Sequence, residues 1–198
     1  MKLLVATTNK GKIREIAEIL SDLDITIISP ADIGLELDVE ENGATFAENA
    51  AIKARAWSRA SSLPALADDS GLCVDALQGR PGVKSARFAG KDARDEENIS
   101  LLLKELKGEK NRTARFVCAA ALALPTGELI MAEGSYEGLI TEEPAGSGGF
   151  GYDPVFFDPN AGKTFARMSA EEKNARSHRR RALEALKGSL QNLLQSQP

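Results

Sequence analysis

The chain has 198 residues, a formal net charge of −4 and a hydrophobic content of 42%. That content can build a core without a disulfide or a structural metal, so we expect one domain over residues 1–198. The acidic balance argues against nucleic-acid binding through bulk electrostatics. The longest apolar run, residues 117–124, is far too short to cross a membrane, so we expect no membrane partner.

The spacing of apolar residues predicts alternating strands and helices in the first third of the chain. In order, these are a strand over 2–8, a helix over 12–20, a strand over 25–29, a helix over 45–61 and a strand over 63–67. Thr45 and Glu48 form a capping-box pattern that opens the second helix. Asp68 and the residues up to Gly71 are expected to end the last of these strands.

The rest of the chain mixes hairpins with helices. The pattern predicts a helix over 95–107 ended by Gly108, strands over 113–124 and 128–137 joined by a turn, a strand over 152–157, and two helices opened by Ser169 and Ser177. Hairpin and crossover connections together indicate an α/β domain with a mixed sheet.

The first candidate binding segment lies between the first strand and the first helix. A helix N-terminus presents free backbone N–H groups and the positive end of the helix dipole, and Lys12 adds a mobile cation, so the segment favours a triphosphate. An ordinary strand–turn–helix connection is the alternative. The segment consists of Thr7, Thr8, Asn9, Lys10, Gly11 and Lys12.

Two pairs of carboxylates are candidates for a Mg²⁺ site. Asp68 and Asp69 follow an apolar strand, where they are costly unless solvated, paired or bound to a metal. Because side chains alternate along a strand, the two should point to opposite faces. Glu40 and Glu41 lie in a loop before a capped helix and could complete an oxygen site, since Mg²⁺ takes one or two carboxylates together with waters and phosphates. The alternatives are a solvated turn and a charged surface loop.

The residues 146–151 match the G-x-G-x-x-G pattern of a dinucleotide-binding turn. That interpretation requires a helix directly afterwards, whereas Tyr152-Asp153-Pro154 and an apolar, β-prone run follow here. The loop therefore indicates close approach of the backbone to a flat or phosphorylated ligand. Phe150 is a candidate stacking face, and a core phenylalanine is the alternative.

A basic helix start is the last candidate. His178, the only histidine, and Arg179 follow Ser177, and Lys173 lies just before them. Cations are unfavourable in the first turn of a helix unless an anion is bound or they face elsewhere, so these side chains could donate to a base carbonyl or a phosphate. Packing against acidic neighbours is the alternative. A single histidine and no adjacent cysteine give little support to covalent catalysis.

These segments occur in an order that resembles the inosine triphosphate pyrophosphatase family, the bacterial dITP/XTP pyrophosphatases. The resemblance spans residues 7–179, and it departs from the family at Thr8, where many members have glycine. The matching stretches are TTNKGK at 7–12, TFAENAAIKA at 45–54, ADDSGL at 67–72, GRPGVKSARFAG at 79–90, GSGGFGYDPVFF at 146–157 and SHR at 177–179.

The resemblance implies Mg²⁺-dependent hydrolysis of a nucleoside triphosphate to the monophosphate and pyrophosphate, with hypoxanthine and xanthine as preferred bases. It also implies a cytoplasmic homodimer and an elongated, twisted mixed sheet flanked by helices, in two lobes with a central cleft.

Carried over by motif, Asp69 would be the acid–base and metal residue, assisted by Glu41 or Glu40 and by Asp68. The segment from Thr7 to Lys12 would hold the triphosphate, and Ser70 would touch the substrate. The nucleoside pocket would consist of Phe150, Gly151, Tyr152, Asp153, Lys173, His178 and Arg179.

Two other functions are compatible with parts of this pattern. A Maf-like pyrophosphatase of modified nucleotides shares the general architecture, but the SHR and FGYD segments argue against it. A nucleotide-binding sensor without turnover is disfavoured by the Asp68-Asp69 and Glu40-Glu41 pairs.

Overall fold

The computed structural model describes residues 1–195, which form a seven-stranded sheet in the order β2-β1-β3-β4-β5-β6-β7, together with five α-helices. The strands are β1 (Lys2–Val5), β2 (Thr26–Ile28), β3 (Ala65–Val74), β4 (Thr113–Ala123), β5 (Leu129–Ile140), β6 (Phe156–Asp158) and β7 (Lys163–Thr164). The helices are α1 (Lys10–Ile19), α2 (Phe46–Ser61), α3 (Asp95–Glu105), α4 (Ala170–Ala175) and α5 (His178–Gln195). β1 pairs in parallel with β2 and β3, whereas β6 pairs antiparallel with β5 and β7. The predicted α/β class with a mixed sheet is confirmed.

The chain forms two compact units. Unit 1 comprises Met1–Asp69, Cys118–Gly134 and the chain from Arg179 onward, and unit 2 comprises Ser70–Val117 and Ser135–His178. The three longest strands, β3, β4 and β5, each contribute residues to both units. The expectation of one domain over residues 1–198 stays a prediction.

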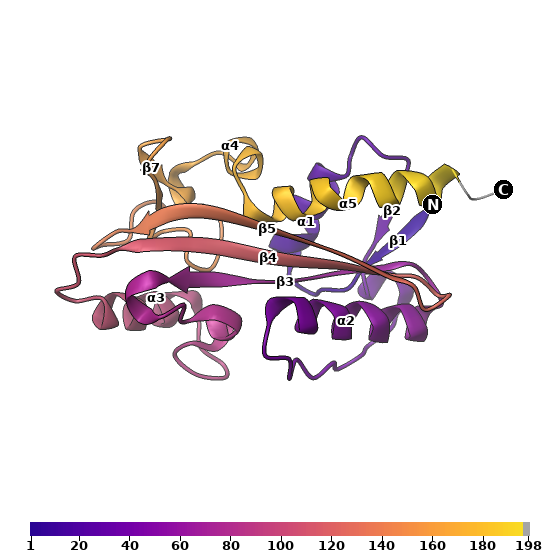
Figure 1. The fold of residues 1–198 in the computed structure, drawn as a ribbon, viewed down its shortest axis with the longest axis horizontal. Helices are drawn as coiled ribbons and strands as arrows, with labels where there is room; N and C mark the ends of the chain where they lie inside the picture. The colour runs from indigo at the N-terminus through magenta and orange to yellow at the C-terminus, as the bar shows by residue number, and fades with distance from the viewer. Residues whose placement is uncertain (196–198) are drawn as a thin grey trace. The chain divides into compact units, whose positions relative to one another are not determined.

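In unit 1 the strands are covered by helices on both faces, as Figure 1 shows, with α1 and α5 on one side and α2 on the other. The alternation of side chains along the strands explains the division. Leu3, Val5 and Leu66 pack with α1 and α5, whereas the intervening Leu4 and Ala65 pack against α2. Both faces of these strands are therefore buried.

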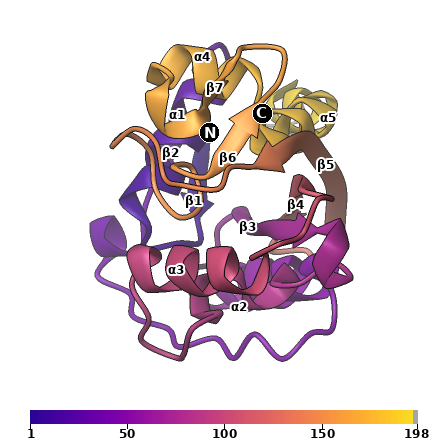
Figure 2. The ribbon, with the colours of Figure 1, turned by 90° about the vertical axis from the view of Figure 1, so that its left-hand side faces the viewer.

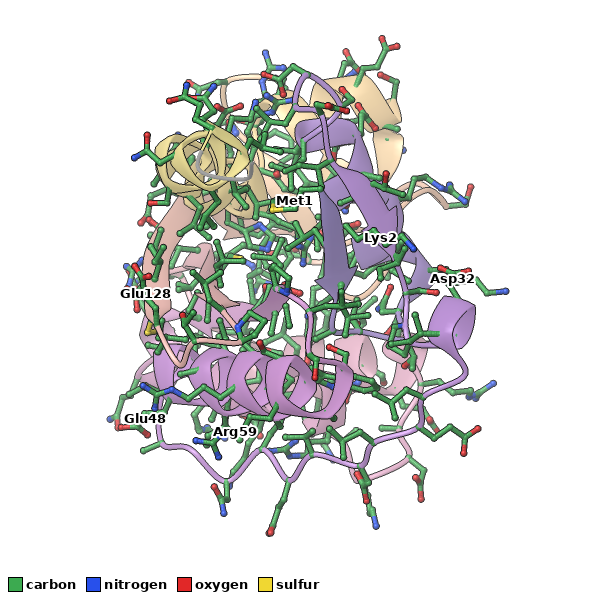
Figure 3. The ribbon with its side chains drawn as sticks, turned by 90° about the vertical axis from the view of Figure 1, so that its right-hand side faces the viewer. Met1, Lys2, Asp32, Glu48, Arg59 and Glu128 are labelled. Carbon is green, nitrogen blue, oxygen red and sulfur yellow. The ribbon has the colours of Figure 1, made fainter. Side chains whose placement is uncertain are left out.

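The α2 face of unit 1 is rich in alanine. Ala50 and Ala54 of α2 contact the alanines of β3 and β4, and these small side chains let the helix approach the sheet closely. The outer surface of α2 is polar, and Figure 3 shows Glu48 and Arg59 extending from it. Glu48 lies in the first turn and Arg59 in the last, so each charge complements the helix dipole.

Unit 2 has its own core, in which α3 packs on one side of the strands, while α4 lies on the other side with β7 (Figure 2). Phe116, Phe156 and Phe165 form its aromatic centre, with ring centroids 4.4 to 5.9 Å apart. Lys163 of β7 is joined to Glu172 of α4 by an ion pair of 2.9 Å. Ser169 and Glu172 form the predicted capping box of α4.

The structure corrects two predicted strands. β3 does not end at Asp68 but continues through both aspartates to Val74, because cations and an amide partner the two carboxylates inside the strand. The predicted strand over 152–157 begins only at Phe156, since the residues before it form turns. Over residues 1–195, none of the helices combines the length and the apolar character that crossing a membrane requires.

Candidate active site

Asp68 and Asp69 point to opposite faces of β3, as the alternation of strand side chains predicts. Asp68 accepts hydrogen bonds from Arg179, on the side of α1 and α5. Asp69 accepts one from Asn49 of α2 on the other side. The two carboxylates therefore occupy different environments and can have different tasks.

The Asp69 carboxylate is 8% exposed and is bounded by two side chains of α2. Asn49 donates to its Oδ2 at 3.1 Å, and the Lys53 ammonium lies 3.8 Å from its Oδ1. Burial raises the pKa of Asp69, Lys53 and the Asn49 hydrogen bond oppose that rise, and the charge of Glu41 adds to it. A partly desolvated carboxylate with a raised pKa is a stronger base than a solvated one.

Glu41 shares the ammonium of Lys53 with Asp69. Its Oε2 lies 3.1 Å from Lys53 Nζ, which also donates to the backbone carbonyl of Asp68 at 2.9 Å. The side chain of Glu40 is exposed, so the structure brings Glu41, and not Glu40, to Asp69.

Two carboxylates that converge on one cation fit the donor chemistry of Mg²⁺, which takes few protein ligands and otherwise keeps waters and phosphate oxygens. Within residues 1–195 the side chains form no closed cluster of three or more potential metal ligands. Glu41 and Asp69 are the residues of unit 1 that could contribute ligands to such an ion.

Asp68 is held by cations. Its Oδ2 lies 3.1 Å from Lys12 Nζ and accepts hydrogen bonds from Nε and Nη2 of Arg179 at 3.2 and 3.1 Å. The third nitrogen of that guanidinium, Nη1, donates to Glu15 of α1. Burial by itself lowers the pKa of Arg179, but the charges of Asp68 and Glu15 outweigh it and raise the pKa, so the group stays ionised.

The contacts of Arg179 give it a role that differs from the one expected. The residue is 1% exposed, and all three guanidinium nitrogens donate to carboxylates of unit 1. This matches the alternative of packing against acidic neighbours. Donation to a base by Arg179 stays a prediction.

The segment before α1 has the predicted position, but its helix N-terminus is capped. Asn9 is the N-cap, and its Oδ1 accepts from the backbone N–H groups of Gly11 and Lys12 at 2.9 and 3.1 Å. A phosphate at these two groups would have to replace the Asn9 side chain. Thr8 and Lys10 are exposed, and Thr7 Oγ1 accepts from Asn9 N–H.

In unit 2 the glycine loop, residues 146–151, is held in place by Asp153, which is 2% exposed. Its Oδ2 accepts from the backbone N–H of Phe150 at 2.9 Å and from Lys173 Nζ at 2.6 Å. At Gly149, where φ is +73°, a Cβ would collide with that same oxygen. Asp153 therefore anchors the loop, and Gly149 is required by both space and conformation.

Lys173 also contacts the ring of Phe150, with Nζ 4.4 Å from the ring centroid. Such a cation–π contact holds the half-buried ring in a fixed orientation. Tyr152 is 4% exposed and donates its hydroxyl to the Ser85 carbonyl at 2.9 Å, and Gly151 N–H donates to Asp95 at 2.6 Å. These contacts of Tyr152 and Gly151 stabilise the loop.

His178 is the first residue of α5 and is 6% exposed. Its ring stacks on Phe116 at a centroid distance of 4.9 Å and an interplanar angle of 18°. Ser177 is buried directly before it, and Ser70 is half-buried in β3 directly after Asp69. Substrate contacts of Ser70 and His178 stay predictions.

Three residues around Asp68 and Asp69 were not predicted as site residues, namely Glu15, Asn49 and Lys53. Asn49 and Lys53 are one helical turn apart on α2, beside the buried Ala50 and Ala54. A polar pair next to an apolar helical stripe is the signal that could have indicated them. Glu15 is a buried acid three residues after Lys12 on α1, which gave a weaker signal.

Comparison with known proteins shows the family of the chain. Curated dITP/XTP pyrophosphatases are similar over nearly their whole length. The protein from Shigella flexneri is 49% identical over 197 residues, which cover 96% of this chain and 98% of the relative. A relative from Thermus thermophilus is 54% identical over 188 residues, with 94% and 90% covered.

Solved structures show the same fold. A HAM1 protein from Coxiella burnetii matches with a TM-score of 0.88 at 43% identity, covering 97% of this chain and 99% of the other. The nucleoside-triphosphatase / dITP/XTP pyrophosphatase from Mycobacterium abscessus matches with a TM-score of 0.76 at 45% identity, covering 94% and 98%. The model of the Ham1 family matches residues 3–189, and the chain therefore belongs to the Ham1 family.

Proposed function

We propose that this chain hydrolyses non-standard purine nucleoside triphosphates, namely ITP, dITP, XTP and dXTP, to the monophosphate and pyrophosphate, and so removes them from the nucleotide pool. The observation that carries the proposal is the buried Asp69 carboxylate beside the ammonium of Lys53, with Glu41 on the same ammonium. The curated relatives that are about half identical to this chain bear the name dITP/XTP pyrophosphatase.

Asp69 is proposed to orient or deprotonate the water that attacks the α-phosphorus in line. Its raised pKa supports this role, because a base is most effective when its pKa approaches the working pH. Lys12 and Lys53 lie within 4 Å of the two aspartates and can offset the negative charge that develops on the phosphate oxygens. No covalent intermediate is required.

Mg²⁺ is proposed as the cofactor, held by Asp69 and Glu41. When bound, the ion would offset the charge on the phosphate oxygens and on the leaving pyrophosphate. In the structure Lys53 balances the charge of both carboxylates, with its ammonium 3.1 Å from Glu41 and 3.8 Å from Asp69.

The glycine loop of unit 2 is proposed to contact the nucleoside. Hypoxanthine and xanthine present an O6 acceptor where adenine presents an amino donor, so a donor aimed at that position discriminates between them. Lys173 is a donor at the Phe150 ring, and Asp153 fixes both of them. An adenine amino group that faces a donor costs about 1–3 kcal/mol.

A pyrophosphate-release assay tests the proposal. The purified chain with Mg²⁺ should release pyrophosphate from dITP and XTP and, much more slowly, from dATP. Asp69→Asn should abolish turnover with the fold retained in circular dichroism. Wild-type turnover in that variant would remove Asp69 from the mechanism.

The same assay separates the competing functions. A preference for dUTP or for modified pyrimidine triphosphates would indicate a Maf-like enzyme. Tight binding of dITP without pyrophosphate release would indicate a sensor.

We also propose that the chain acts as a homodimer in the cytoplasm, as the family resemblance implies. Sedimentation equilibrium tests the first part, and a mass of one chain at micromolar concentration would contradict it. Fractionation of cells that express the tagged protein tests the second.

A further inference from the structure

We propose that Asn49 is a positioning residue that joins the loop carrying Glu41 to the Asp69 carboxylate, so that the two carboxylates keep a fixed relation. The inference rests on the proposed function, because it concerns the same pair of acids. It adds a residue that touches neither metal nor substrate and acts only through its neighbours.

The Asn49 side chain has two hydrogen-bond partners of opposite kind. Its Oδ1 accepts from the backbone N–H of Gly43 at 2.8 Å, and its Nδ2 donates to Oδ2 of Asp69 at 3.1 Å. The side-chain amide offers an acceptor and a donor on one planar group, so the two partners fix its orientation. A carboxylate or an apolar side chain cannot make both bonds.

The backbone of Asn49 is held as firmly as its side chain. The residue lies in the first turns of α2, where its N–H donates to the carbonyl of the N-cap Thr45 at 3.2 Å. Glu48 extends from the outer surface of α2 (Figure 3), whereas Asn49 points inward and is 1% exposed. A rigid helix therefore carries the amide, and the loop and the carboxylate are placed relative to that helix.

Gly43 shows how close the contact is. A Cβ built on Gly43 would lie 2.7 Å from Oδ1 of Asn49 and 2.7 Å from Cβ of Glu48, so only glycine lets the loop approach the amide. Glu41 is two residues before Gly43. It forms an ion pair with Lys53, which lies one helical turn after Asn49 on α2. Asn49 and Lys53 thus hold the loop and Asp69 from the same face of α2.

The chain contains a matched control in Asn98, which occupies the same position in α3 that Asn49 occupies in α2, four residues after the N-cap. It is 3% exposed, and its Oδ1 accepts from the backbone N–H of Ala89 at 2.8 Å. Its Nδ2, however, donates to the Ala86 carbonyl at 3.3 Å and not to a carboxylate. Asn98 therefore holds a backbone N–H outside its helix, as Asn49 does, but its Nδ2 does not bind the Asp69 carboxylate.

Three variants test the inference: Asn49→Ala, Asn49→Asp and Asn98→Ala. The measurements are kcat and KM for dITP, the thermal midpoint, and Mn²⁺ binding followed by electron paramagnetic resonance without nucleotide. Asn49→Asp keeps an acceptor for Gly43 but places a like charge against Asp69, so it remains informative if Asn49→Ala does not fold.

Asn49→Ala should lower kcat and the affinity for Mn²⁺, each by about 10–100-fold, with a smaller change in KM. Asn49→Asp should lower kcat by at least about tenfold although its thermal midpoint lies closer to that of the wild type. Asn98→Ala should lose thermal stability and keep kcat within about twofold of the wild type.

Unchanged kcat in Asn49→Asp would overturn the inference, as would an equal loss of kcat in Asn98→Ala. If the wild type hydrolyses none of ITP, dITP and XTP, the proposed function fails and Mn²⁺ binding decides the inference separately. Equal Mn²⁺ affinity in the wild type and Asn49→Ala, or no Mn²⁺ binding by either, would then overturn it.

Discussion

At the scale of single residues, the space around a glycine determines whether a larger residue can replace it. Gly43 has no room for a Cβ because Asn49 Oδ1 and Glu48 Cβ would each be 2.7 Å away. Gly188 lies in the interior of α5, is exposed, and has nothing within 4 Å of where a Cβ would be. The two positions should respond oppositely to the same substitution.

Gly43→Ala should therefore destabilise the chain and lower kcat, since the loop must move away from Asn49. Gly188→Ala should stabilise it by about 0.5–1 kcal/mol, because alanine loses less conformational entropy in a helix. Urea denaturation measures both changes. A Gly43→Ala variant as stable and as active as the wild type would show that the close contact is not required.

Tyr152 makes the stability of the chain depend on pH in the alkaline range. Burial, and then the charge of Asp95, raise the pKa of its phenol in the folded state. Its contribution is fully present below about pH 10, the pKa of an unfolded tyrosine, and is lost as pH rises through the folded-state pKa. Tyr152→Phe should cost about 1 kcal/mol at pH 8, because the bond to the Ser85 carbonyl is lost.

The variant should also lose stability less steeply than the wild type above about pH 10. Chemical denaturation at a series of pH values between about 8 and 11 gives both curves. Parallel curves for the two proteins would contradict the assignment of the pH dependence to Tyr152.

The predicted site residues show what a sequence can reveal at this scale. Asp69 and Glu41 could be predicted because carboxylates next to an apolar strand or a capped helix stand out from their surroundings. The polar position of Asn49 beside an apolar helical stripe is a weaker signal, because its two partners, Gly43 and Asp69, are brought to it by the fold and the second is 20 residues away. Sequence patterns describe a residue's own surroundings along the chain, whereas its partners depend on the fold.

At the scale of elements, the period of two in β3 correctly predicted that Asp68 and Asp69 face opposite ways. The length of the strand was not predicted. Two adjacent acids usually end a buried strand, unless charged partners compensate for their burial. The partners of Asp68, Lys12 and Arg179, belong to α1 and α5, so the continuation of β3 depends on helices remote from it in sequence as well as on α2.

Arg179 joins three elements of unit 1, since it binds Asp68 of β3 and Glu15 of α1 from the first turn of α5. Arg179→Ala would leave two buried carboxylates without their main cation. Breaking a buried ion pair in this way costs about 3–5 kcal/mol, so the variant should unfold at much lower urea concentration. Arg179→Lys should recover part of the loss, because it keeps the positive charge. The recovery should be incomplete, because an ammonium cannot reproduce the paired hydrogen bonds of the guanidinium.

The control is Arg180→Ala, which removes the pair with Glu184 on the surface of α5. Such an exposed pair contributes about 0–1 kcal/mol. If Arg179→Ala is as stable as Arg180→Ala but has a raised KM for dITP, the predicted role of Arg179 in binding the base would replace the structural one.

At the scale of the whole molecule, the order of strands and helices gave the α/β class and the mixed sheet, because hairpin and crossover connections leave different spacings in a sequence. The division into two units could not be predicted in the same way. Its boundaries fall inside β3, β4 and β5 and at the start of α5, within regular segments that carry no linker composition.

A ligand that binds but cannot be hydrolysed should stabilise the folded chain, so its effect on the free energy of unfolding measures recognition apart from turnover. A dITP analogue with a methylene group between the α- and β-phosphates cannot release pyrophosphate, yet it keeps the base and the charge. With Mg²⁺ and at about 100 times its Kd, it should raise the free energy of unfolding by about 2.7 kcal/mol. The shift is measured by urea denaturation with and without the analogue.

The matching dATP analogue at the same concentration should give a smaller shift, because its amino group meets a donor where O6 would accept. Removing Mg²⁺ with EDTA should reduce the shift for both, since Asp69 and Glu41 would then face phosphate charge without a metal between them. Equal shifts for the two analogues would mean that any base discrimination arises in the chemical step. A shift that EDTA leaves unchanged would mean that the lysines beside these carboxylates are enough to bind the phosphates.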